Sequence, residues 1–240
     1  LPVFADESIY VRWSQVMRAE PSLRFLPLSD GKQPLFMWAT IPLFKVISDP
    51  LIAARTLSAL AGMGTIAGIA LTTHLLFKNR RITLLAGLLS AVLPYLVFFD
   101  RLALADSLLS MFIIWAFVFS YLAVVHRRLD MAMMAGFSLG FAWLTKSPAL
   151  FALFLLPTLF IFMPKITIRN FLVSCFLFLV SFVISFGMYN ILRLGPEFHM
   201  IAIRNQDYVY TASEFLRHPF DPLVPHLKDS FNFNFSLLTP

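Results

Sequence analysis

Six apolar blocks make up most of the chain, separated by short polar stretches. Each is long enough, or nearly so, to cross a bilayer, whose hydrocarbon core about 30 Å thick needs roughly 20 helical residues. The fourth and fifth blocks are short, and Pro148 should break them into a tight hairpin at Lys146-Ser147-Pro148, because proline disfavours helix at the preceding residue. We therefore predict an all-α, polytopic bundle with transmembrane helices at about 52–77, 82–99, 103–125, 131–146, 148–163 and 170–194.

The segment from Pro34 to Ser48 is apolar but only 15 residues long, and it carries Lys45. Runs of this length are more often interfacial than membrane-spanning. If the segment crossed, the loops 6–33 and 100–106 would lie on opposite sides of the membrane. We predict an interfacial, juxtamembrane segment, because this arrangement puts the informative polar residues on one face.

Composition indicates a membrane protein. Hydrophobic residues make up 59% of the 240 residues, charged residues 13%, and the mean hydropathy is +0.78, whereas an average soluble domain carries about 25% charged residues. The net charge of +6 collects in short loops between apolar blocks, so it indicates orientation and not a nucleic-acid partner. The single cysteine, Cys175, lies in an apolar run, which excludes a disulfide framework within the chain.

The basic loops predict the orientation. Counting the helices alternately places three of these loops on one side, which the positive-inside rule assigns to the cytoplasm: 78–81, 126–128 and 165–169. The predicted organisation is one transmembrane domain over 1–240, with an extracytoplasmic loop (6–51), six helices (52–194) and an extracytoplasmic segment (195–240). Since the chain begins at Leu1 without a signal peptide, we expect a piece of a longer multi-pass protein.

Two acidic positions on the predicted outer face can carry chemistry. Asp6, followed by Glu7, comes directly after a short apolar start, where a carboxylate can remove a proton from an acceptor hydroxyl. Asp106 lies at the entrance to a predicted span, where ionisable residues are costly and often functional. Helix capping is the alternative for both, with Asp100 and Arg101 as an interfacial ion pair. Both interpretations stay open on these residues alone.

Three cations fall on the same face: Lys32, Arg55 and Lys146. They could hold a lipid phosphate, arginine through a bidentate fork and lysine as a point charge. Snorkelling of the long side chains to lipid headgroups explains the same positions equally well.

Five short motifs follow one another in a recognisable order. They are Asp6-Glu7-Ser8-Ile9-Tyr10, Gly31-Lys32-Gln33-Pro34-Leu35-Phe36, Ala54-Arg55-Thr56-Leu57-Ser58-Ala59-Leu60, Arg101-Leu102-Ala103-Leu104-Ala105-Asp106 and Leu144-Thr145-Lys146-Ser147-Pro148. The series resembles the protein O-mannosyltransferase and lipid A aminoarabinose transferase family of glycosyltransferase family 39-like enzymes. No single motif is specific, and the resemblance depends on their order. It runs from Asp6 to about Pro148.

The resemblance implies a GT-C fold and transfer of a hexosyl or pentosyl group from a polyprenyl-phosphate donor on the extracytoplasmic face. Asp6 then matches the base that acts on the acceptor, with Glu7 beside it, and Asp106 matches a second acid. The cations Lys32, Arg55 and Lys146 match residues that hold the carrier phosphate or shape the site, and we add Tyr10 and Arg101 as substrate-binding residues. Gln33-Pro34 departs from the family's frequent pair of prolines after the lysine.

Several points remain open at this level. The acceptor can be a protein, a lipid or a glycan, and inversion at the anomeric carbon is inferred from the single-base arrangement. No cofactor is expected with certainty, although two carboxylates can attract a divalent metal. We expect membrane lipids as partners and a bacterial or archaeal cell membrane as the location, with the active site facing outward. The alternative function is a transporter with Asp6, Asp106 and Lys146 along a solute path.

Overall fold

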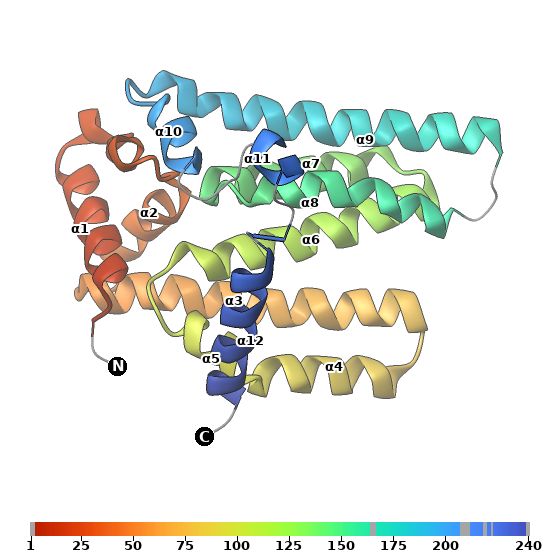
Figure 1. Cartoon of the computed structure of the whole chain (residues 1–240), viewed down its shortest axis with the longest axis horizontal. Coiled ribbons are helices and arrows are strands. Elements are labelled where there is room, and N and C mark those ends of the chain that lie inside the picture. Colours follow the sequence, from red (N-terminus) through yellow and green to blue (C-terminus); the bar gives the residue numbers. More distant parts are fainter. Residues whose placement is uncertain (1–2, 164–166, 207–211, 218–219, 222, 239–240) are drawn as a thin grey trace.

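The computed structural model describes residues 3–163, 167–206, 212–217, 220–221 and 223–238, and within these ranges the regular elements are helices (Figure 1). Among the described residues, three helices are long and apolar enough to cross a membrane as single spans. They are α3 (Pro50–Phe77), α6 (Ala105–His126) and α9 (Ile168–Tyr189), the last continued to Leu194 by the 3-10 helix η5 (Asn190–Leu194).

The other predicted spans are bent or short. Helices α4 (Arg80–Val92) and α5 (Pro94–Asp100) form one apolar pair bent by 58°. The sequence analysis does not predict this bend, although Pro94 causes it by the rule applied to Pro148. The break predicted at Lys146-Ser147-Pro148 is confirmed, and it separates α7 (Leu129–Thr145) from α8 (Ala149–Leu155) and η4 (Leu156–Phe162).

Small residues let the long helices approach closely. Where α7 meets α9, a Cβ added to Gly136 would lie 2.9 Å from the Ser181 carbonyl oxygen, so only glycine fits there. The Ser181 hydroxyl donates a 2.7 Å hydrogen bond to the Ala132 carbonyl across the same interface. Since lipid gives helices no hydrophobic drive to associate, close packing and interhelical hydrogen bonds of this kind hold the bundle together.

One end of the bundle carries a layer of short helices (Figure 1). It consists of α1 (Ala5–Ala19), η1 (Pro21–Leu23), η2 (Leu26–Asp30), α2 (Leu35–Thr40), η3 (Ile41–Lys45) and α10 (Met200–Gln206). The turns from α3 to α4 and from α6 to α7 lie at the opposite end (Figure 1). The segment from Pro34 to Ser48 therefore does not cross the bundle, which confirms its prediction as juxtamembrane.

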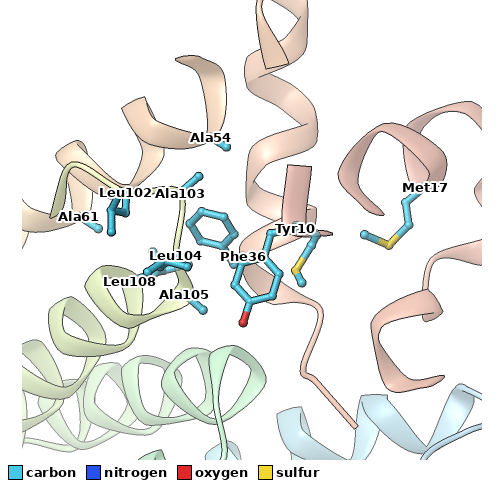
Figure 2. Packing of buried hydrophobic residues seen from close by; sticks show 11 residues of the cluster. Tyr10, Met17, Phe36, Ala54, Ala61, Leu102, Ala103, Leu104, Ala105 and Leu108 are labelled. Carbon is cyan, nitrogen blue, oxygen red and sulfur yellow. The ribbon is translucent and has the colours of Figure 1, made fainter. Parts of the chain in front are cut away.

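The short helices are anchored by a buried apolar cluster. Phe36, fully buried, packs its ring 5.9 Å from that of Tyr10 and contacts small residues of α3 and of the turn before α6. Figure 2 shows Ala54 and Ala103 on one side of Phe36 and Tyr10 on the other, with the Tyr10 hydroxyl at the edge of the cluster. This packing fixes α1 and the entrance to α6 relative to each other.

Among the described residues after Gln206, two further helices follow α10. They are α11 (Ala212–Arg217) and α12 (Leu223–Leu238), and α12 packs against α5. The sequence analysis predicts an extracytoplasmic segment for 195–240 and makes no assignment of helices within it. Its position relative to the membrane stays a prediction.

Candidate active site

Helix α1 directs its two acidic residues to different places. It begins at Ala5, so Asp6 and Glu7 both lie in its first turn, where a negative charge interacts favourably with the helix dipole. Glu7 turns toward the bundle and is fully buried, whereas the Asp6 side chain is 47% exposed. Adjacent carboxylates thus sit in opposite environments.

The Glu7 carboxylate is saturated with hydrogen bonds. Arg55 of α3 donates to it from Nε and Nη2, both at 2.9 Å, and the amides of Ala103 and Phe4 donate at 2.7 and 2.9 Å. Burial opposes the charged form, but these hydrogen bonds and the Arg55 charge outweigh it and lower the pKa of Glu7. Glu7 therefore ties α1 to α3 and to the turn that precedes Asp106.

Asp6 contacts a lysine that is itself enclosed. Lys32 Nζ lies 3.3 Å from Asp6 Oδ1 and 3.3 Å from Asp30 Oδ2. The same nitrogen lies 5.1 Å from the ring centre of Tyr10 and 5.5 Å from that of Trp13, within the range of cation–π attraction. Two carboxylates and two aromatic faces thus fix the Lys32 ammonium group.

The Tyr10 hydroxyl stays protonated in this setting. Burial raises the pKa of Tyr10, and the charges of Asp6 and Asp106 raise it further. The phenol therefore keeps its proton near neutral pH and can donate a hydrogen bond into the space beside Asp6.

Asp106 makes the second ion pair of this region. It lies in the first turn of α6, and its Oδ1 is 2.7 Å from Lys146 Nζ at the end of α7. The next residue, Ser147, accepts a 2.6 Å hydrogen bond from the side chain of Gln33. These contacts join the α7–α8 break both to the α6 entrance and to the loop that carries Lys32.

Capping, the alternative function of the two aspartates, does not describe their geometry. The N-cap positions are Phe4 and Leu104, and each aspartate pairs with a lysine. Asp100 and Arg101 also differ from the predicted ion pair, since the Asp100 side chain interacts with Ser107 and Arg101 is exposed. The interfacial ion pair that belonged to the capping alternative is therefore not formed.

These elements surround a cavity of about 490 Å³ at the end of the bundle that carries the short helices. Of the sequence-predicted site residues, Asp6, Tyr10, Lys32 and Lys146 line it, whereas Glu7, Arg55, Arg101 and Asp106 do not. Asp106 still reaches it indirectly, through Lys146. The other lining residues are Gly31, Gln33, Thr145, Ser147, Pro148, Leu150, Phe151, Arg204 and Asn205.

Arg204 is the cation that the sequence analysis misses. It belongs to α10, and its Nη1 lies 2.9 Å from Asp30 Oδ1. The only sequence signal is its place in the polar stretch after the last apolar block, and no spacing rule connects it to residues more than a hundred positions away. Tertiary packing of α10 against η2 brings it to the cavity.

Metal ligands do not gather in the described part of the chain, where no three His, Cys, Asp or Glu side chains come together. Asp6 and Asp106 each face a lysine instead.

The fold and the cavity define an all-α, multi-pass integral membrane protein whose acidic and basic side chains meet at one end of its helices. A family model described as dolichyl-phosphate-mannose-protein mannosyltransferase matches residues 31–189, about two thirds of the chain. The chain belongs to this family, and the predicted fold class and resemblance are confirmed. No curated protein and no solved structure matches the chain.

Family membership establishes the general activity. The chain is a membrane glycosyltransferase of the GT-C type that uses a polyprenyl-phosphate-linked sugar donor. The matched residues include Lys32, Arg55, Asp106 and Lys146, but neither α1 nor Arg204. The roles of Asp6, Tyr10 and Arg204 therefore depend on geometry.

Proposed function

We propose that this chain transfers a sugar from a polyprenyl monophosphate to an acceptor hydroxyl on the extracytoplasmic face, with Asp6 as the general base. The observation that supports this function is the cavity itself, which brings a half-exposed carboxylate, Asp6, together with Lys32, Lys146 and Arg204 from four separate segments. One base and several cations are what this reaction requires, because the donor already carries a good leaving group.

In the proposed reaction, the acceptor oxygen attacks the anomeric carbon as its proton passes to Asp6. The bond from that carbon to the phosphate oxygen breaks, and the electron pair leaves with the phosphate. Lys32, Lys146 and Arg204 stabilise the charge that develops there. A single in-line displacement of this kind inverts the anomeric configuration.

The flanking residues have supporting roles in this proposal. Asp106 orients Lys146 through their 2.7 Å ion pair, and Gln33 holds the α7–α8 break in place through Ser147. Glu7 and Arg55, which the sequence analysis places in the site, are assigned instead to holding α1 against α3. Leu150 and Phe151, at the start of α8, give the cavity an apolar wall suited to the first isoprene units of the carrier.

The proposed extracytoplasmic location is supported by the charges at the other end of the bundle. Lys78, Arg80 and Arg81 lie at the α3–α4 turn, and Arg127 and Arg128 at the α6–α7 turn, so the positive-inside rule places that end in the cytoplasm. Single cysteines in place of the exposed residues Ser8 and Asn79, in a Cys175→Ser background, test this. A membrane-impermeant thiol reagent added to intact cells should label position 8 and not position 79. Labelling of both from the same side would contradict the orientation.

The activity is tested by incubating the purified enzyme with a panel of polyprenyl phosphate sugars and acceptors. The family description makes mannose and protein hydroxyls the first to try, and pentosyl donors, lipids and glycans follow. Transfer with inversion of the anomeric bond is expected for one donor. Retention, or no turnover of any donor by folded enzyme, would overturn the proposal. The transporter alternative is less well supported, because the cavity charges lie at one end of the bundle rather than along it.

A further inference from the structure

One carboxylate outside the cavity bridges two of its cations. Asp30, at the end of η2, has Oδ1 2.9 Å from Arg204 Nη1 and Oδ2 3.3 Å from Lys32 Nζ. Each oxygen serves a different cation. Arg204 Nη1 also donates a 2.8 Å hydrogen bond to the Asp30 carbonyl oxygen, so both side chain and backbone of Asp30 hold the guanidinium group.

The backbone next to Asp30 is shaped for this contact. Gly31 has φ +64°, and a Cβ there would lie 2.6 Å from both Arg204 Cβ and the Met200 carbonyl oxygen. Only glycine combines the left-handed conformation with such a close approach of α10. Leu28 and Ile201, both buried, pack in one apolar cluster beneath this junction. Helix α10 is thereby docked on η2, which brings Arg204 beside Lys32.

The position of the Asp30 carboxylate bears on whether it positions the two cations or competes with a bound phosphate for them. Lys32 and Arg204 line the cavity, whereas Asp30 is not among its lining residues. Asp30 therefore contacts both cations without itself lining the cavity. Arginine has five N–H donors and lysine three. Arg204 keeps donors beyond those that Asp30 accepts, and Lys32, which contacts both Asp6 and Asp30, keeps one for an anion in the cavity. An anion in the cavity need not displace Asp30.

We propose that Asp30 is a positioning residue of the donor site, which holds Lys32 and Arg204 together as a two-cation cradle for the phosphate of the polyprenyl carrier. Without a shared counter-charge the two cations would repel each other and separate. When Asp30 supplies this counter-charge, Lys32 and Arg204 form a preformed anion site at the cavity. Ordering their side chains then costs little free energy when the phosphate binds. The inference rests on the proposed function, since it assigns the phosphate to this part of the cavity.

The test is Asp30→Asn, which keeps size and removes the charge. Binding of sugar-free polyprenyl phosphate should weaken about tenfold, the loss expected for one charge-assisted hydrogen bond. The donor KM should rise similarly while kcat changes little, because the base and acceptor are untouched. Polyprenol of the same length, which lacks the phosphate, should bind wild type and variant equally. Asp30→Glu should recover part of the affinity.

Asp49→Asn is the matched control. Asp49 caps α3 by accepting hydrogen bonds from the Leu51 and Ile52 amides, and asparagine caps helices about as well, so binding and turnover should not change. A double-mutant cycle with Arg204→Gln adds a second control. If Asp30 acts through Arg204, the double variant should bind polyprenyl phosphate little worse than Arg204→Gln alone.

Three outcomes would overturn the inference. Unchanged binding by Asp30→Asn would show that the carboxylate has no part in the cradle, and tighter binding would show that it competes with the phosphate. A lower melting temperature with normal binding by the folded fraction would leave only a structural role. Failure of the proposed function is distinguishable, because wild type would then bind polyprenol and polyprenyl phosphate alike and transfer no sugar.

Discussion

The two carboxylates at the start of α1 are adjacent in sequence, and yet they differ in almost every physical respect. Glu7 is fully buried and accepts four hydrogen bonds from Arg55, Ala103 and Phe4. Asp6 is half-exposed, lines the cavity and touches a single lysine at 3.3 Å. A saturated carboxylate has no lone pair left for a substrate, whereas Asp6 keeps most of its acceptor capacity.

Two residues of the same helical turn therefore have different roles: Glu7 is structural, and Asp6 is the proposed catalytic base. The Glu7–Arg55 pair stabilises the scaffold, because removal of either partner would leave a buried charge uncompensated. The Asp6–Lys32 pair leaves both groups accessible to a ligand in the cavity. Neutralising each acid in turn should therefore damage two different properties of the enzyme.

The largest effect on turnover is expected from Asp6→Asn. Asparagine cannot accept a proton near neutral pH, and loss of a general base typically costs about a hundredfold to ten-thousandfold in rate. Because Asp6 does not cap α1, folding and carrier binding should survive. Single-turnover transfer from a bound donor, with Asp49→Asn as control, measures the loss. Turnover within a few-fold of wild type would exclude Asp6 as the base.

Glu7→Gln should instead lower stability. Leaving Arg55 without its buried counter-charge should cost about 3 kcal/mol, with near-normal turnover per folded molecule. Since the pKa of Glu7 is lowered in the folded state, its contribution is present above the ordinary pKa of 4.5 and is lost as pH falls through the folded value. Thermal melting in detergent should therefore show a wild-type advantage at pH 7 that shrinks in acid.

The matched variant for this comparison is Glu20→Gln, at the other end of α1, where the carboxylate is exposed and bonds only locally to Ser22. It should melt as wild type does. If Glu7→Gln melted normally and lost turnover instead, Glu7 would be catalytic and the division between the two acids would be wrong.

The sequence predicts the helical scaffold well, because a bilayer core about 30 Å thick requires apolar helices of roughly 20 residues. All six apolar blocks are helical, three of them as single long helices, and Pro148 broke the hairpin where expected. The juxtamembrane position of residues 34–48 followed from the short length of the segment together with the placement of the polar residues on one face. The bend at Pro94 shows the limit of this reasoning, since the length and hydropathy of residues 82–99 predict one span although Pro94 lies within it.

The site is less predictable, because sequence patterns place residues on a face and do not aim their side chains. Glu7 and Asp6 are equivalent by position, and only the packing of α1 on α3 separates them. Arg55 matches a substrate-binding position of the resembling family, but in the structure it turns to Glu7. Arg204 reaches the cavity through the docking of α10, a long-range contact that no local pattern encodes.

Lys146→Gln tests whether the Lys146–Asp106 pair, like the Lys32–Asp6 pair, supplies a cation that binds the donor phosphate. Loss of the ammonium group removes one phosphate contact and leaves Asp106 as an unpaired negative charge nearby. The donor KM should rise about tenfold. Lys45→Gln, which changes an exposed lysine at the end of η3, should leave the KM unchanged.

The double variant Lys146→Gln/Asp106→Asn resolves the role of Asp106. If Asp106 serves only to orient Lys146, removing its repulsive charge should return part of the lost affinity. If Asp106 is itself a catalytic acid, the double variant should lose turnover as Asp6→Asn does. Steady-state measurement of KM and kcat for both variants separates these outcomes.

The smallest effect is expected from Tyr10→Phe, which tests how much of the site is held by the aromatic ring and how much by its hydroxyl. The ring packs on Phe36 and faces Lys32 Nζ at 5.1 Å, and phenylalanine preserves both contacts. Loss of one neutral hydrogen-bond donor should lower kcat/KM by about two- to tenfold. Because the raised pKa of Tyr10 keeps the phenol protonated, the pH profile of the variant should follow that of wild type. Tyr95→Phe, in α5 and away from the cavity, is the control. A loss above a hundredfold would mean that the Tyr10 hydroxyl takes part in proton transfer, and Asp6 would then no longer be the only proton acceptor to consider.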